Sequence, residues 1–150
     1  MTGEAGRPAD ADPYGLERFV SAQDDGGTFE RALTELRAGR KASHWMWFVF
    51  PQVAGLGHSA MSRTYAITGL DEARAYFAHP VLGSRLKQAA EVVLEVPDRR
   101  AEQIFGGIDA QKLRSSMTLF LRACPGDDVF RRVLDRFFGG AADPATDQRL

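Results

Sequence analysis

This sequence of 150 residues has one cysteine, no long apolar run and little net charge, and each of these excludes a class of protein. The single cysteine, Cys124, cannot form a disulfide within the chain, which favours a reducing, cytoplasmic location. No run approaches the roughly 18 apolar residues that a membrane-spanning helix needs, so no membrane span is expected. The net charge of −1 gives no global reason to expect nucleic-acid binding.

Motifs for metals and common cofactors are also missing. The three histidines stand 14 and 21 residues apart, and a Cys-x-x-Cys pair would need a second cysteine. The string GGIDAQK lacks the spacing of a phosphate-binding loop, and no dinucleotide fingerprint is present. We therefore expect no metal and no resident cofactor.

The remaining composition fits one soluble domain. Hydrophobic residues make up 44% and charged residues 26% of the chain, which is ordinary for a globular protein. A chain of this length can bury roughly two thirds of its unfolded surface. Residues 1–15 are rich in Gly, Ala, Pro and Asp and lack the apolar core of a secretory signal, so they predict a flexible leader. We expect a single domain over residues 16–150.

Apolar residues recur at helical spacing along most of the chain, and no alternating run predicts a sheet. The aromatic segment HWMWFVF, residues 44–50, has no clean period, and we assign it to a short buried helix because its surroundings are helical. Expected helix starts are marked by Thr28, by His79 with Pro80, by Asp109, and by Asp143 with Pro144. The expected fold is all-α, an irregular multihelical single domain.

Four stretches of the chain carry a resemblance to a known family. They are GRKASHWMWFVFPQVAGLG, YAITGLDEARAYFAHPVLGSRL, IFGGIDAQKLRSSMTLF and LDRFFGGAADPAT. Together they resemble the family catalogued as domain of unknown function 1810, over residues 16–150. The resemblance implies a compact all-helical fold. It implies no reaction, because that family has no settled biochemical role.

A second similarity concerns rhythm alone. The string KLRSSMTLFLRACPGDDVFRRVLDRFF is similar in spacing to the C-terminal half of the NADAR family, helical N-glycosidases that act on nucleotide-like substrates. The Glu-containing aromatic motif and the Trp-Gly-Asn-x-Leu-Gly motif of that family are absent here. No catalytic residue is carried over, and the similarity indicates a substrate class only.

Positive charge without opposing acids surrounds the aromatic segment. Between Leu36 and Leu70 the chain has no Asp or Glu, and its cations are Arg37, Arg40, Lys41 and Arg63. A phosphate or carboxylate ligand is favoured in such a field, with arginine able to bind it through two hydrogen bonds. The alternative is that acids from distant segments fold back onto these cations as surface ion pairs.

Trp45 and Trp47 stand two residues apart, which separates them by about 200° on a helix and places them on one face of a strand. In one interpretation one indole anchors the core and the other stacks on a planar ligand such as a base. In the other interpretation both rings lie in the core. Gln52 has an amide that either reads the edge of a base or fixes the loop, and the sequence does not separate these roles.

His44 and His58 are the candidate catalytic residues. His44 closely follows Arg40 and Lys41, which would keep its ring neutral, as a general base requires, although it could instead cap a helix. His58 lies in a glycine-rich loop, and loops often carry functional residues.

Lys112, Ser115 and Ser116 are expected to line the same site from a helix. Lys112 and Ser116 are four residues apart and are therefore neighbours on one helical face. A Ser–Lys nucleophile pair is one interpretation. The other is that these serines bond to carbonyl groups one turn earlier.

These observations combine into one hypothesis. The chain would bind, and in an enzyme version hydrolyse, a small anionic, planar, nucleotide-like metabolite between residues 40–58 and the Lys112–Ser116 helix. Arg40 or Lys41 would hold the anion, and the enzyme would be a hydrolase, with the N-glycosidases as the nearest class. The alternative is a non-catalytic protein-interaction module whose aromatic segment is core or a partner patch.

Overall fold

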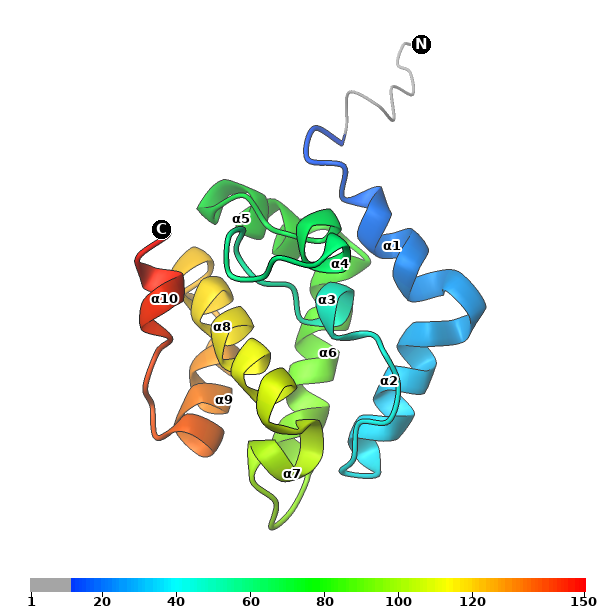
Figure 1. Ribbon diagram of the computed structural model, residues 1–150, viewed down its shortest axis with the longest axis vertical. Helices are drawn as coiled ribbons and strands as arrows, with labels where there is room; N and C mark the ends of the chain where they lie inside the picture. The colour runs from blue at the N-terminus through cyan, green and yellow to red at the C-terminus, as the bar shows by residue number, and fades with distance from the viewer. Residues whose placement is uncertain (1–11) are drawn as a thin grey trace.

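The computed structural model describes residues 12–150, and within them the secondary structure is helical (Figure 1). The helices are α1 (Glu17–Asp24), α2 (Thr28–Arg37), α3 (Met46–Val49), α4 (Ala60–Thr64), α5 (Leu70–Ala78), α6 (Leu82–Glu95), α7 (Ala101–Phe105), α8 (Gly107–Ala123), α9 (Val129–Phe138) and α10 (Pro144–Asp147), with a 3-10 turn, η1 (Asp25–Gly27), after α1. No strand forms in this part of the chain, which confirms the all-α prediction. None of these helices has the length and apolar character needed to cross a membrane.

Helix α8 lies at the centre of the packing. It contacts α5, α7, α9 and α10, while α6 contacts α2, α5 and α9 (Figure 1). Its buried residues occupy more than one face and include the polar residues Ser115, Ser116 and Thr118. Because such a helix has little access to water, its polar side chains depend on hydrogen-bond partners inside the protein, which Ser115 and Thr118 find.

The aromatic segment forms the short buried helix that we predicted, α3, which lies between α2 and α8 in Figure 1. Trp45, Phe48 and Phe50 are all buried. The ring of Trp45 packs on Phe50 and Phe105, with ring centres 6.3 and 6.5 Å apart. The segment ends at Pro51, and a residue before proline is disfavoured in a helix.

Of the four predicted helix starts, the one at Asp143 is confirmed, and the one at His79 is confirmed in its capping side chain alone. The Nδ1 atom of His79 accepts hydrogen bonds from the backbone N–H groups of Val81 and Leu82, at 3.1 and 3.2 Å. Asp143 caps α10, with Pro144 as the first helical residue. Side chains with an acceptor close to the backbone therefore marked both positions correctly.

The predicted starts at Thr28 and Asp109 are wrong, and so is the expectation that Pro80 is the first helical residue. Thr28 is the first residue of α2 and Gly27 takes the cap position, with a left-handed backbone that only glycine adopts easily. Pro80 precedes α6, which begins at Leu82 because His79 caps the turn in between. Asp109 lies inside α8, since Gly106, at a φ of +81°, lets the helix begin two residues before it.

Replacing His79 with alanine should lower the free energy of unfolding by about 1 kcal/mol, the usual effect of removing a capping acceptor. His79→Asn keeps a short side chain with an acceptor and should recover most of that stability. Urea unfolding followed by circular dichroism measures both variants. Equal stability of His79→Ala and the parent protein would show that this cap contributes nothing.

Residues 12–15 form a turn that starts α1. The carboxylate of Asp12 accepts hydrogen bonds from the backbone N–H groups of Leu16 and Glu17, at 2.6 and 3.0 Å. The leader predicted over residues 1–15 therefore overlaps a structured turn at its end, and its first 11 residues lie outside the described part of the chain.

The loop that follows α3 is fixed at two points. Val53 and Ile67 form an isolated parallel bridge, in which the N–H of Ala54 donates to Ile67 and that of Ile67 donates to Gln52, at 2.8 and 2.9 Å. Further on, the guanidinium of Arg149 rests on Gly55, so closely that an added Cβ would overlap it. The loop is thereby attached to both the α4–α5 region and the end of the chain.

Candidate functional site

Glu35, on α2, fixes the turn that leads into the aromatic segment. Its carboxylate accepts hydrogen bonds from the N–H groups of Ala42 and Ser43, the Ser43 hydroxyl and the indole N–H of Trp45, at 2.6 to 3.0 Å. Partial burial alone would raise the pKa of Glu35, but the four hydrogen bonds outweigh burial and lower the pKa from 4.5 to about 2. This carboxylate is therefore a strong structural clamp.

Sequence analysis missed Glu35, although a signal for it existed. A buried indole N–H needs an acceptor, and the segment between Leu36 and Leu70 contains no acid. A carboxylate acceptor for a buried tryptophan of this segment can therefore come only from outside it, and Glu35 is the last acid before it.

The two tryptophans occupy different environments. Trp45 is fully buried, at 0% exposure, with its N–H bound to Glu35. Trp47 is only partly buried and packs at the edge of the core. Trp45 is thus the core anchor, and Trp47 is the tryptophan with ring surface near solvent.

A row of alternating charges joins these two rings. The Lys41 ammonium lies 5.0 Å from the ring centre of Trp45 and 2.8 Å from one carboxylate oxygen of Asp109. The other oxygen of Asp109 lies 3.6 Å from the Lys112 ammonium, which in turn lies 5.1 Å from the ring centre of Trp47. We call Lys41, Trp47, Asp109 and Lys112 the junction cluster, because it joins the aromatic segment to the start of α8.

The two lysines of the junction cluster differ in how firmly they are held. The Lys41 side chain is 9% exposed, and its ammonium also donates to the carbonyl oxygen of Ser43 at 2.6 Å. The Lys112 side chain is 23% exposed, and its polar and ring contacts within residues 12–150 are the longer one with Asp109 and the one with the ring of Trp47. Lys112 is therefore the lysine that can turn toward a ligand.

The other predicted residues of the 40–58 segment lie at or near the surface. Arg40, His44 and His58 are exposed, and Gln52 is partly buried. Within residues 12–150, acids from distant segments compensate Lys41 but form no ion pair with Arg37, Arg40 or Arg63. Most of the positive charge predicted around the aromatic segment is therefore unopposed by direct contacts.

Ser115 and Ser116, both on α8, have different hydrogen-bond environments. The Ser115 hydroxyl donates toward the Gln111 carbonyl and the Asp143 carboxylate, at 3.1 and 2.8 Å, and so belongs to the cap of α10. The Ser116 hydroxyl is buried and has no hydrogen-bond partner among the described residues, Lys112 included. The structure therefore places Ser115 with α10 and shows no bonded Ser–Lys pair.

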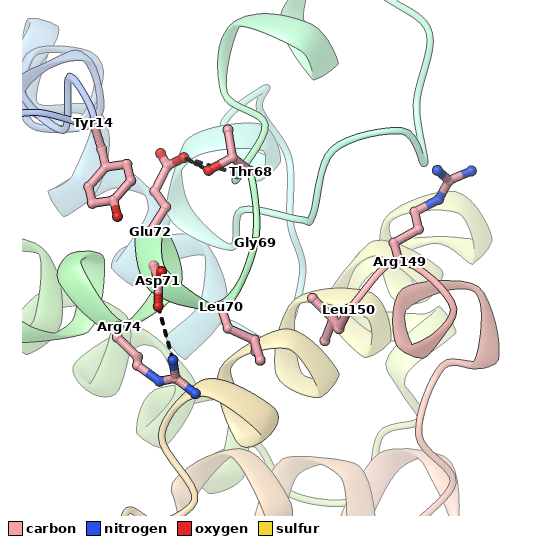
Figure 2. Close-up of a pocket in the computed structure, with 9 residues that line it drawn as sticks. All are labelled: Tyr14, Thr68, Gly69, Leu70, Asp71, Glu72, Arg74, Arg149 and Leu150. Carbon is pink, nitrogen blue, oxygen red and sulfur yellow. Dashed lines mark hydrogen bonds and ion pairs between the residues drawn. The ribbon is translucent and has the colours of Figure 1, made fainter.

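Surface hollows occur elsewhere. Four of them, between about 390 and 890 Å³, have walls formed by residues outside the junction cluster. One, of about 550 Å³, lies between the start of α5 and the end of the chain and is drawn in Figure 2. Its lining residues are Tyr14, Thr68, Gly69, Leu70, Asp71, Glu72, Arg74, Arg149 and Leu150.

The charges in this hollow are mostly paired. Arg74 bonds to Asp71 at 3.1 Å, and Glu72 accepts from Thr68, as Figure 2 shows. Glu72 also pairs with Arg18 at 2.9 Å. Both acids that line the hollow are therefore engaged by neighbouring side chains. Among residues 12–150, no group of three His, Cys, Asp or Glu could hold a metal ion.

Comparison with known proteins places this chain. The family described as "Protein of unknown function (DUF1810)" matches residues 13–150. The chain belongs to this family. The chain is similar in structure to the conserved hypothetical protein Rv1873 from Mycobacterium tuberculosis, with 47% sequence identity and a TM-score of 0.90 over 93% of this chain and 98% of that chain. No curated protein matches. The description of the DUF1810 family names no activity, and the geometry of the site is the available evidence on function.

Proposed function

We propose that this DUF1810 protein binds a small anionic, planar, nucleotide-like ligand at the junction cluster. Lys112 would hold the acid group, and Trp47 would stack on the flat ring. The observation that supports this is the Lys112 ammonium, 5.1 Å from the ring centre of Trp47 and loosely paired with Asp109 at 3.6 Å. A cation beside a partly exposed aromatic ring supplies one contact for each part of such a ligand.

Lys112 can leave its present position at low cost. If its ammonium turns to a ligand, Asp109 keeps its 2.8 Å pair with Lys41, so no carboxylate is left unpaired. Moving Lys41 instead would strip a nearly buried ammonium of three favourable contacts. Because Lys112 covers Trp47 and the hollows described above lie elsewhere, the ligand would bind by displacing this side chain.

A nearby exposed cation would assist. Arg40 directly precedes Lys41 in the chain and forms no ion pair among residues 12–150. Its field would raise the local concentration of anions without a direct contact to the ligand. Gln52 would contact the edge of the ring. In a hydrolytic version of this proposal, His44 would be the general base on water, since it directly precedes Trp45, with His58 as the second candidate.

A thermal-shift screen against nucleotides, nucleosides, ADP-ribose and aromatic carboxylates tests the proposal. A ligand at 100 times its dissociation constant stabilises a protein by about 2.7 kcal/mol, roughly 5–10 °C for a chain of this size. The shift should disappear in Lys112→Met. It should persist in Lys87→Met, which removes a lysine of α6 that pairs with Asp127 at 2.9 Å, away from the junction cluster. A shift that survives Lys112→Met would place the ligand elsewhere.

One observation favours the interaction module as a second candidate. Tyr14 and Leu150 are two of the large apolar side chains that stay exposed within residues 12–150, and both line the hollow in Figure 2. An apolar side chain of a protein partner would fit between them, with Arg149 at the rim. Absence of any shift across the ligand screen, in a folded sample, would favour this candidate over the first.

A further inference from the structure

We infer that the junction cluster selects acid groups with a single negative charge, and that Asp109 is the residue that sets this limit. The inference rests on the proposed function, because it concerns the ligand of the same site. It names the substrate class more narrowly: a flat ring that carries a carboxylate or a phosphodiester, in preference to one that carries a phosphate monoester.

The charge count of the cluster supports this selection. Lys41 and Lys112 contribute two positive charges and Asp109 one negative charge, which leaves one charge for a ligand. Lys41 is already bonded to Asp109 and Ser43, so this remaining charge is that of Lys112. The carboxylate of Glu35, bound to the N–H of the same Trp45 ring that Lys41 contacts, adds a second negative group. The local balance therefore gives no further cation for a second negative charge.

The geometry places the acid group of a ligand beside Asp109. Lys112 and Asp109 are three residues apart on α8 and their charged groups lie 3.6 Å apart before any ligand binds, so an ammonium that turns to a ligand keeps the anion on the same helix face as this carboxylate. The first negative charge of a ligand gains the attraction of Lys112 against this repulsion. A second charge would meet the same repulsion with no further cation of the junction cluster in contact, and the field of the exposed Arg40 is screened by water.

Two matched ligand pairs test this inference by calorimetry on the full chain at pH 7.5 and fixed ionic strength. Adenosine 3′,5′-cyclic monophosphate carries one charge and adenosine 5′-monophosphate two. 2-Naphthoate carries one and 2-naphthyl phosphate two. In whichever pair binds, the singly charged member should bind at least about ten-fold more tightly. At pH 5 the monoester, whose second pKa is about 6, is mostly singly charged, and the gap should close. The cyclic nucleotide keeps its charge over this range and therefore controls for changes in the protein itself.

Asp109→Asn gives an independent readout. It removes the negative charge and retains a carbonyl oxygen for the lysines, so the preference for single charge should fall or reverse. Asp135→Asn, at an exposed position on α9, is the matched control and should keep the preference. If Asp109→Asn does not fold, binding of the two ligand pairs to the parent protein, and its pH dependence, still test whether the site prefers a single negative charge.

The outcomes separate the two proposals. Equal or tighter binding of the doubly charged member, with binding lost in Lys112→Met, overturns the charge selection and leaves the proposed function in place. No binding by any of the four compounds or by the wider panel overturns the proposed function, and the inference falls with it.

Discussion

Gly83→Ala should destabilise the protein by about 3 kcal/mol or more, because α5 and α6 are packed too closely for an added methyl group. Gly83 is buried, and a Cβ placed there would overlap the backbone carbonyl of Phe77. A backbone group cannot rotate away as a flexible side chain does. The two helices would have to separate, and the nearby packing of Phe77 on Phe130, with ring centres 5.3 Å apart, would loosen.

Gly107→Ala is the matched control for this change. Gly107 is also a helical glycine, the first residue of α8, but a Cβ there would meet no atom within 4 Å. Alanine should therefore leave stability unchanged or raise it by about 0.5–1 kcal/mol. Urea unfolding followed by circular dichroism compares the two variants. If Gly83→Ala were as stable as Gly107→Ala, α5 and α6 would have room for a methyl group at Gly83, which would contradict their close packing.

Glu35→Ala should have the second largest effect, a loss of about 2–4 kcal/mol. It removes the acceptor for four donors, and the indole N–H of the buried Trp45 would be left without a partner. A buried donor without an acceptor destabilises by about 1–3 kcal/mol, and the hydrogen bonds of the turn add to this. Glu30→Ala, at an exposed position on the same helix, should stay within about 0.5 kcal/mol of the parent.

The effect of Glu35 should also depend on pH. Its pKa is about 2 in the folded protein against 4.5 ordinarily, so the carboxylate stabilises the fold above pH 4.5 and loses this contribution as the pH falls toward 2. The shift is equivalent to about 3 kcal/mol at its limit, and partial exposure reduces the expected pH-dependent part to about 1–2 kcal/mol. The stability difference between the parent and Glu35→Ala should therefore narrow between pH 6 and pH 3. A difference that stays constant over this range would contradict the lowered pKa.

The helical fold was predictable because helical spacing of apolar residues is a local property. The caps at His79 and Asp143 were predictable for the same reason, since a capping side chain bonds within a few residues. The start of α8 was not, because two consecutive glycines permit a helix to begin at either side of them and give no acceptor that fixes it. Asp109 was consequently assigned a capping role that it does not have.

The contacts of the junction cluster could not be predicted, because they join residues that are far apart in the sequence. Unopposed charge predicted that Lys41 would hold an anion, and the structure supplies that anion from its own α8, at Asp109. Nothing local to Lys41 indicates this partner, because the contact depends on how α7 and α8 pack against the aromatic segment. The roles of Trp45 and Trp47 were left open for a related reason: a segment of one helical turn has too few residues to show which face is buried.

Because the two tryptophans are buried to different extents, their indole N–H groups should exchange with deuterated water at different rates. The chain has two indole N–H groups, and one of them, on Trp45, is sealed in the core and bound to Glu35, whereas Trp47 lies near solvent. In deuterated water the proton of Trp47 exchanges through small side-chain movements. The proton of Trp45 exchanges only when the turn from Lys41 to Ser43 comes away from α2. The ratio of the two exchange rates therefore compares the separation of the turn from α2, which exposes Trp45, with the small side-chain movements that expose Trp47.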